Sequence, residues 1–444
     1  MKKLIFLTTV LTFIFTLAAC GGDDSITVTV GVDSDEMGNA LVEKWENDFP
    51  DSEINLAFEN YDSVNSETGG MQGLELSQDN APDVALVIDG EVIGREGAVN
   101  PLPQNLIDIG YDDTLENVFT SINQLDYFYL PAFYDGMVFS WNRTMLEEWD
   151  VDLTDSNGNN LPDAIDSWEK IFAMADDYGM DVDDRPMFRD ESILEFYPIS
   201  LDEVWSGYSS LTAGGWELFS SGNYDDPEFD NPAFLEGLKF IEAFSQTNMS
   251  VDETGNKKAA GEMTWRWEDT YLEGDHPFSL VGTWMDVENA IESNDLDLEF
   301  SVMPTWNDEQ LRPLMKTKGF VVNGFTPYET ESFEVLEWLY TEATMATMIN
   351  NSAYLPALSS ESDIFPEMDA AFKEDFSIAM EANAFEVSAT LPNNPSTAAM
   401  DVYYNIDLNL VLRDLWDGEI TPEEAQADIV EEANDWMESN NTLD

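Results

Sequence analysis

Apolar residues in the first quarter of the chain recur at two spacings. Residues 26–32 alternate between apolar and polar side chains and are rich in β-branched types, which predicts a strand, whereas the apolar residues of 39–49 fall at helical spacing. Residues 54–58 and 82–88 predict two further strands, and residues 91–98 predict a short helix. Strands that alternate with helices are typical of an α/β unit with a largely parallel sheet.

The rest of the chain continues this mixture. Residues 127–141 predict a strand, a turn at residues 134–136 and a second strand. Further helices are expected over 168–178, 232–244 and 331–347, and further strands over 277–284 and 300–304. From Asp363 onwards the pattern is almost entirely helical, and Thr421 followed by Pro422 predicts the start of the last helix. No low-complexity linker interrupts these segments, so we expect two α/β lobes joined by several extended crossings.

The N-terminus has the features of an export signal. Lys2 and Lys3 precede an apolar run over residues 4–19, which is too short for a stable transmembrane helix and fits the apolar region of a secretory signal. The string 17–20, Leu-Ala-Ala-Cys, resembles the lipobox of bacterial lipoproteins, in which the cysteine becomes the lipidated first residue. The resemblance implies a signal peptide over 1–19, lipid on Cys20, a spacer over 20–25 and a location on the outer face of the cell membrane. That location is the periplasmic side if the host has two membranes. The alternative is an ordinary signal peptide with an incidental cysteine.

Acidic residues dominate the composition. The 444 residues include 91 Asp or Glu against 17 Lys or Arg, which gives a net charge of -74. Hydrophobic residues make up 43% and aromatic residues 12%, enough for large cores, so global disorder is excluded. The acid excess repels phosphate, and neither nucleic acid nor an anionic lipid surface is therefore expected as a partner.

The acids are spread along the whole chain rather than gathered in one tail. Signal cleavage would remove two lysines and no acid, which takes the net charge from -74 to -76. Repulsion on this scale destabilises a compact state unless salt screens it. The composition therefore predicts a halophilic protein from a saline habitat.

Several strings, in order and at compatible spacing, resemble the family 1 extracellular solute-binding proteins, the maltose-binding-like receptors of ABC importers. They are residues 81–84 (Ala-Pro-Asp-Val) with 97–102, residues 131–142, residues 167–171 (Ser-Trp-Glu-Lys-Ile), residues 271–274 with 281–284 (Val-Gly-Thr-Trp), residues 354–357 (Tyr-Leu-Pro-Ala) and residues 421–425. The resemblance spans essentially the whole chain after the signal. It implies a two-lobed periplasmic-binding-protein type II fold with a helical C-terminal part, which closes around a solute in the cleft between its lobes. Lobe one would hold 26–133 and 318–360, and lobe two 137–316 and 361–440.

The same resemblance implies which residues contact the solute. Sugars are held by aromatic faces and by carboxylate or amide groups. The implied contacts are Asp35, Glu36, Asp89, Glu91, Asp135, Asp202, Trp205, Trp284 and Tyr403. Trp284 is expected to stack on the sugar, with packing in a core as its alternative. A solvated surface role is the alternative for each acid. Glu36 stands where the maltose receptor has lysine, which argues for a different solute.

Residues 155–166 have the oxygen spacing of an EF-hand calcium loop. The side chains of Asp155, Asn157, Asn159, Asp163 and Asp166 and the carbonyl of Leu161 would be the ligands. Asn160 occupies the position where glycine is usual, and asparagine tolerates the left-handed backbone required there. We expect either a structural Ca²⁺ in lobe two or a plain polar turn before Trp168.

Catalysis finds little support in the residue types. His276 is the only histidine, and neither a Gly-x-Ser-x-Gly elbow nor a phosphate-binding glycine loop is present. A surface glycoside hydrolase needs only two carboxylates, but the eight strand–helix repeats of a hydrolase barrel are not visible. A receptor for a cationic amine is a further alternative, because acids and aromatic faces bind ammonium groups. The sequence therefore predicts a monomeric receptor with no required cofactor, which binds a carbohydrate and delivers it to an ABC permease.

Overall fold

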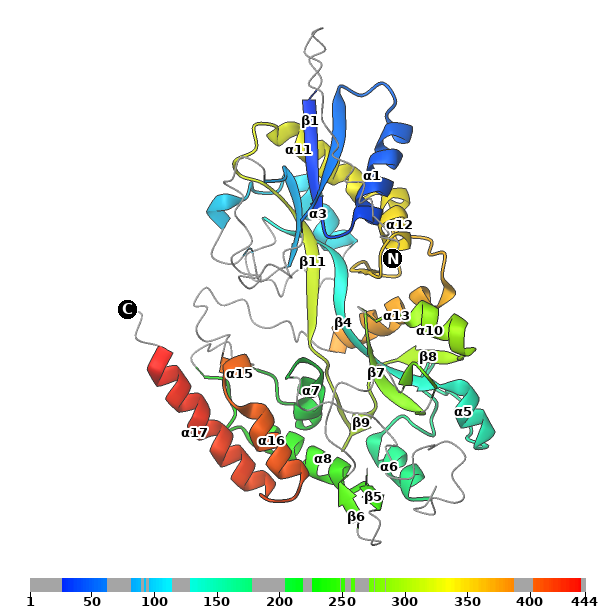
Figure 1. The fold of residues 1–444 in the computed structure, drawn as a ribbon, viewed down its shortest axis with the longest axis vertical. Coiled ribbons are helices and arrows are strands. Elements are labelled where there is room, and N and C mark those ends of the chain that lie inside the picture. The colour runs from blue at the N-terminus through cyan, green and yellow to red at the C-terminus, as the bar shows by residue number, and fades with distance from the viewer. Residues whose placement is uncertain are drawn as a thin grey trace, which may run out of the picture.

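The structure is a computed structural model with two lobes, one above the other in Figure 1. It describes residues 26–61, 81–88, 92, 96–113, 128–177, 204–218, 226–247, 249–251, 257–259, 271–274, 276–283, 285–386 and 402–440. The first lobe contains the N-terminal strands, and the second contains the last helices of the chain.

The first lobe is built on a mixed sheet. Its elements are β1 (Ile26–Val32), α1 (Asp35–Asp48), β2 (Ile54–Asn60), β3 (Val84–Ile88), a 3-10 turn (Glu96–Ala98), α3 (Gln104–Asp112), the start of β4 (Leu130–Asn142), β11 (Met315–Val322), α11 (Glu329–Leu339), α12 (Glu342–Asn350) and β12 (Leu355–Pro356). The strand order is β12-β4-β11-β3-β1-β2. β1 is parallel to β2 and β3, as the α/β pattern predicts, whereas β11 is antiparallel to β3 and β4.

Helix α1 begins four residues before the predicted segment because Ser34 caps it. The Ser34 hydroxyl accepts a hydrogen bond of 3.0 Å from the Met37 backbone N–H. Two acids fill the first turn, where the helix dipole stabilises negative charge. The Trp45 indole then donates to the Ile54 carbonyl at 3.0 Å, which fixes the helix against β2.

The expectation of a turn at residues 134–136 is wrong. β4 is one strand of 13 residues, whose first half pairs with β11 and β12 and whose second half pairs with β7 and β8. A reversal at Gly136 would remove the hydrogen-bonding partners of one half. Glycine instead permits a close approach, because a Cβ there would lie 2.9 Å from Met380 Cε and 3.0 Å from Met315 Cγ.

The second lobe carries most of the helices. Its elements are the end of β4, α5 (Arg143–Glu148), α6 (Trp168–Asp177), α7 (Val204–Leu211), a 3-10 turn (Thr212–Gly214), α8 (Pro232–Thr247), β5 (Met249–Val251), β6 (Lys257–Ala259), β7 (Phe278–Gly282), α10 (Val287–Asn294), β8 (Leu298–Ser301), β9 (Thr305–Trp306), β10 (Glu309–Gln310), α13 (Ala371–Glu386), α15 (Val402–Asn405), α16 (Leu408–Trp416) and α17 (Pro422–Asn440). Within the described residues, no helix combines the length and the apolar character needed to span a bilayer.

Each lobe has its own apolar core. The core of the first lobe packs β1, β3 and β11 against α1, α11 and α12. The core of the second lobe is rich in aromatic rings, and the Trp168 ring lies 5.4 Å from Phe240 and 5.6 Å from Phe244 between centroids. Phe365 and Met368 pack against the first core and Phe376 belongs to the second, so the chain crosses between lobes at the start of α13.

The helical prediction for residues 331–347 is correct in type but covers two helices. α11 ends at Leu339 and α12 begins at Glu342. The break places the Tyr340 side chain in the core of the first lobe, where its hydroxyl donates to the Leu130 carbonyl. Because that acceptor is 210 residues away, local spacing carries no sign of the break.

The helical prediction for the C-terminal part is confirmed for the described residues, and so is the start of the last helix. The Thr421 hydroxyl accepts from the Glu424 N–H, while the Glu424 carboxylate accepts from the Thr421 N–H. This reciprocal arrangement is a capping box.

Candidate functional site

Solute contacts are expected where the strands of the first lobe end next to the second lobe. β11 runs from Met315, in the core of the second lobe, to Phe320, in the core of the first. Between them, Lys318 pairs with Ile88 at the carboxyl end of β3. Because β1 is parallel to β3, the residues that follow β1 lie at the same edge. We call this the interlobe edge: the carboxyl ends of β1 and β3 with the first half of β11 (Figure 1).

Three polar side chains meet at the interlobe edge. Lys318 Nζ lies 3.0 Å from Asp33 Oδ2 and also donates to the Tyr354 hydroxyl. The Tyr354 hydroxyl in turn donates to the same Asp33 oxygen. The two charged side chains are mostly covered, with exposed fractions of 10% for Lys318 and 16% for Asp33. We call these three residues the Asp33 cluster.

Aromatic packing orients the Asp33 cluster. The Tyr354 ring stacks on Phe133 at 5.0 Å between centroids, and the Lys318 ammonium lies 4.4 Å from the Tyr354 centroid. Within the described residues, no hydrogen bond reaches the second Asp33 oxygen, Oδ1. The cluster can therefore accept a hydrogen bond from a solute through a carboxylate that is already held in place.

Asp35 and Glu36, both predicted as solute contacts, lie next to this cluster in the first turn of α1. Both side chains are exposed. The Asp35 carboxylate accepts a long hydrogen bond of 3.3 Å from the Asn60 amide. The structure thus brings these two acids to the interlobe edge, where solute contact remains a prediction.

Most of the other predicted contacts lie where side chains are not described. Asp89, Glu91, Asp202 and Trp284 fall outside the described residues. For Asp135 and Trp205 the structure gives only the backbone, in β4 and α7 respectively. Their contacts with solute stay predictions.

Tyr403 differs from the other predicted contacts because it is fully buried. Its exposed fraction is 0%, and its ring meets Tyr208 edge-on at 5.6 Å within the core of the second lobe. The structure does not bring Tyr403 together with the Asp33 cluster, whose aromatic partner Phe133 belongs to the core of the first lobe. These surroundings are those of a packing residue, and solute contact by Tyr403 stays a prediction.

In the predicted calcium loop, the carboxylates bind backbone groups. Asp155 accepts from the N–H groups of Asn157, Gly158 and Asn160 at 2.8 to 3.0 Å. Asp163 accepts from the N–H and hydroxyl of Ser156, and these bonds lower the pKa of its carboxyl. Asn160 has a φ of 59°, so the expected left-handed backbone is confirmed.

A lysine shares the oxygens of this loop. Lys170 Nζ donates to Asp166 Oδ1 at 2.7 Å and to the Asp163 carbonyl at 2.6 Å. Among the described residues, no group of three or more His, Cys, Asp or Glu side chains is arranged to hold a metal ion. Calcium binding at residues 155–166 and the polar-turn alternative both stay predictions.

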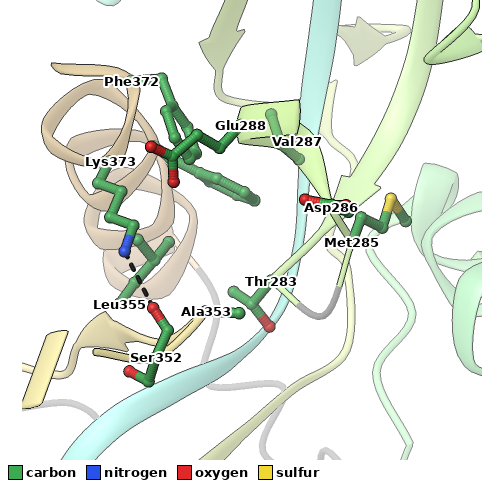
Figure 2. Close-up of a pocket in the computed structure, with 11 residues that line it drawn as sticks. Thr283, Met285, Asp286, Val287, Glu288, Ser352, Ala353, Leu355, Phe372 and Lys373 are labelled. Atoms are coloured by element: carbon green, nitrogen blue, oxygen red, sulfur yellow. Dashed lines mark hydrogen bonds between the residues drawn. The ribbon is translucent and has the colours of Figure 1, made fainter. Parts of the chain in front are cut away.

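A pocket of about 310 Å³ lies between the lobes beside α13 (Figure 2). Its walls are residues 283 and 285–288 around the start of α10, Ser352, Ala353 and Leu355 before and within β12, and Phe372, Lys373 and Phe376 of α13. Phe133 of β4 stacks on Tyr354, whereas a Cβ at Gly136 of β4 would contact Met380 of α13. These two positions are an odd number of residues apart on the strand, so they face opposite sides of the sheet. The pocket and the Asp33 cluster therefore lie on opposite faces of the strands that join the lobes.

Lys373 closes one side of this pocket. Its ammonium donates to the carbonyls of Ile349 and Ser352, both at 2.9 Å, and thereby caps the end of α12. Burial lowers the pKa of Lys373, while the carboxylates of Glu288 and Asp369 act in the opposite direction. Glu288 faces Lys373 from α10 (Figure 2). The Lys373 ammonium thus links α13 to the end of α12 through hydrogen bonds.

Sequence reasoning missed the Asp33 cluster. Asp33 directly follows a predicted strand, two residues before Asp35, but Asp35 is identified through the family resemblance, which does not include Asp33. Lys318 lies in a strand buried on both faces, an unusual place for lysine. Only their meeting in space shows that they act together.

Comparison with known proteins gives a family and a fold. The family model described as bacterial extracellular solute-binding protein matches residues 40–378. Among solved structures, the maltose-binding periplasmic protein MalE from Listeria monocytogenes, in complex with maltose, is similar over 93% of this chain and 98% of that chain. The TM-score is 0.69 and the identity is 18%. None of the curated proteins matches this chain.

The similarity to MalE confirms the predicted two-lobed type II fold, and at 18% identity it shows the fold alone. The family model goes further, because it covers well over half of the 444 residues. The chain therefore belongs to the bacterial extracellular solute-binding proteins.

Proposed function

We propose that this protein is a lipid-anchored receptor of an ABC importer, which captures a carbohydrate between its lobes and delivers it to the permease. The observation that carries the proposal is the family match over residues 40–378. The two lobes joined by β4, β11 and the segment before α13 are the architecture of a receptor that closes around its ligand.

A carbohydrate is the proposed solute class for two reasons. MalE, which shares the fold, was crystallised with maltose. The described interlobe edge offers carboxylates, a tyrosine hydroxyl and an ammonium, all of which form hydrogen bonds with sugar hydroxyls. A cationic amine is the alternative solute, because the edge also carries the exposed acids Asp35 and Glu36.

Titration of the mature protein with a panel of neutral oligosaccharides and polyamines tests the solute class. We expect intrinsic fluorescence to change with a neutral sugar, and the radius of gyration measured by X-ray scattering to fall as the lobes close. Binding of polyamines alone would overturn the carbohydrate proposal while leaving the receptor intact. Release of sugar fragments during incubation would instead favour the glycoside hydrolase alternative.

Trp284 is proposed as the aromatic platform for the sugar, by resemblance to the Gly-x-Trp segment of the family. A buried aromatic anchor is typically worth about 2–4 kcal/mol of binding free energy. Trp284→Ala should therefore weaken binding roughly thirtyfold to a thousandfold without lowering the melting temperature. A destabilised variant with unchanged affinity would show that Trp284 packs in a core instead.

Lipid anchoring is tested at Cys20. Cells that express the protein are grown with radiolabelled palmitate, and the label should appear in the wild type and be absent from Cys20→Ser. The variant should keep its solute affinity, because residues 20–25 are proposed to be only a spacer. Equal labelling of both proteins, or of neither, would contradict the lipobox assignment.

A further inference from the structure

We infer that Asp33 is the carboxylate through which the first lobe recognises the hydroxyl groups of an uncharged sugar, and that Lys318 is its positioning residue. The inference rests on the proposed carbohydrate receptor and adds the charge of the solute and the residue that selects it. It starts from the contacts of the Asp33 cluster.

The cluster fixes one oxygen of Asp33 and leaves the other available. Oδ2 accepts hydrogen bonds from both the Lys318 ammonium and the Tyr354 hydroxyl. Within the described residues, no hydrogen bond reaches Oδ1, and the side chain retains an exposed fraction of 16%. A carboxylate held in this way loses little rotamer freedom when a ligand binds, which favours affinity.

The resident ammonium argues against a cationic solute. A receptor for an amine needs carboxylates whose charge is balanced only when the ligand arrives. Here the most covered acid of the described interlobe edge already has a cation 3.0 Å away. An ammonium group of a ligand at Oδ1 would also face the charge of Lys318 at close range, and like charges at such distances repel.

An acidic sugar is disfavoured for the opposite reason. Of the side chains that the structure describes at this edge, three are carboxylates, on Asp33, Asp35 and Glu36, and one is an ammonium, on Lys318; the side chain of Lys316, in the same half of β11, is not described. That ammonium already donates two hydrogen bonds within the cluster. A uronate would meet excess negative charge, whereas a neutral hydroxyl donates a hydrogen bond to Oδ1 without charge repulsion.

The cluster also explains why the aromatic platform must come from elsewhere. The Tyr354 ring is engaged by Phe133 and by the Lys318 ammonium, and Phe133 is fully buried. The first lobe therefore contributes polar recognition through Asp33. Stacking is left to residues such as Trp284.

The test measures affinity and charge preference together. Wild-type protein is titrated with neutral trisaccharides of glucose, xylose, mannose and N-acetylglucosamine. The tightest binder is then compared with its counterparts in which one hydroxyl is replaced by an ammonium group or a hydroxymethyl by a carboxylate. We expect the wild type to bind the neutral sugar more tightly than either charged counterpart.

Three variants probe the cluster. Asp33→Asn, which keeps the shape of the side chain, should weaken binding of the neutral sugar roughly tenfold to a hundredfold, as expected for loss of a charge-assisted hydrogen bond. Tyr354→Phe, which keeps the stacked ring, should weaken it by a smaller factor. Lys318→Met should weaken the neutral sugar and shift the preference toward the ammonium counterpart, because Asp33 then lacks its cation. A merely structural role for Lys318 would not change that preference.

Matched controls come from the other end of α1. Lys44 Nζ lies 2.8 Å from Asp48, in an ion pair of the same residue types that is remote from the interlobe edge. Lys44→Met and Asp48→Asn should leave affinity and charge preference unchanged. If Asp33→Asn binds as tightly as Asp48→Asn, or if the wild type prefers the ammonium counterpart, the inference is wrong although a sugar receptor remains. If the wild type binds no trisaccharide at all, the proposed carbohydrate specificity fails as well.

Discussion

At Gly319 the backbones of β11 and β4 approach so closely that no side chain fits between them. A Cβ there would lie 2.3 Å from the Leu130 carbonyl oxygen and 2.5 Å from the Tyr129 ring. The register between the two strands shifts at the same place, between Lys318 and Gly319. This local irregularity sets the position of Lys318 and thus the geometry of the Asp33 cluster.

Gly319→Ala should therefore destabilise the protein. Overpacking of this kind typically costs about 1–3 kcal/mol of unfolding free energy, and displacement of Lys318 should also weaken solute binding. Urea denaturation measures the first effect and titration the second. Gly97→Ala is the control, because a Cβ at Gly97 meets no atom within 4 Å. Equal stability of the two variants would show that β4 and β11 can separate at no cost.

Tyr403 permits a second test at the residue scale. Because its ring is fully buried in the core of the second lobe, Tyr403→Ala should lower the unfolding free energy by about 3–5 kcal/mol. Tyr403→Phe, which retains the ring packed against Tyr208, should lose much less. A Tyr403→Ala variant that is fully stable but fails to bind sugar would instead support Tyr403 as a solute contact.

At the scale of elements, α17 depends on a charge at its start. The Thr421 N–H and hydroxyl both donate to the Glu424 carboxylate, and these bonds lower the pKa of Glu424. A group whose pKa is lower in the folded state stabilises the fold above its unfolded pKa, and that contribution is lost as pH falls through the folded pKa.

Glu424→Gln should accordingly lower the melting temperature at pH 7, and this deficit should shrink as pH falls through the lowered folded-state pKa and the wild-type carboxyl is protonated. Glu431→Gln, which removes an exposed acid from the same helix, is the control. A deficit of Glu424→Gln that stays constant as the pH is lowered until the protein unfolds would mean that the charge of Glu424 contributes nothing.

The predicted calcium loop is the other element with a direct test. Ca²⁺ at residues 155–166 should stabilise the folded state by RT ln(1 + [Ca²⁺]/Kd), which is about 2.7 kcal/mol at a hundredfold excess over Kd. The melting temperature should rise accordingly. Because Lys170 occupies Asp166 and the Asp163 carbonyl, Lys170→Ala should bind the ion more tightly. Lys239→Ala, which removes a lysine paired with Glu236 elsewhere in the lobe, should not. Identical melting curves with Ca²⁺ and with chelator in both variants would leave only the polar turn.

The elements predicted well from sequence are those whose stability is local. β1, β2 and α8 lie at or within a few residues of their predicted bounds because alternation or helical spacing reflects burial of one face. The errors at β4 and at the break after α11 have a common cause. In both, partners far along the chain decide whether the backbone continues or bends, as when Tyr340 reaches Leu130.

The same limit applies to the candidate site. Asp35 and Glu36 could be named from sequence because the family resemblance places solute contacts after the first strand, a segment that local alternation also predicts. The Asp33 cluster could not, because its members are 285 and 321 residues from Asp33 along the chain. Only the fold reveals which lysine neutralises which acid.

At the scale of the whole molecule, the charge is too large for its internal pairs to balance. The described residues contain eight ion pairs, whereas the full chain has 91 acids and only 17 lysines and arginines. Three of the eight share Arg143, so even these cations are concentrated on a few acids. Most carboxylates are therefore left without an internal cation, and we expect the folded state to depend on mobile ions that screen their repulsion.

The melting temperature at pH 7 should therefore rise steeply as NaCl increases from about 0.01 M to about 1 M, over which the screening length falls from about 30 Å to about 3 Å. Because this rise comes from repulsion between carboxylates, it should shrink as pH falls toward the pI of about 4.1 and the carboxylates are neutralised. Sucrose is the control, because it stabilises folded proteins by exclusion from their surface and not by screening. Its effect should be similar at pH 7 and close to the pI, whereas the effect of NaCl should not. A melting temperature that is independent of salt at pH 7, or a salt effect that persists undiminished close to the pI, would show that charge repulsion does not govern the stability of this fold. Either result would remove the physical basis for a saline habitat.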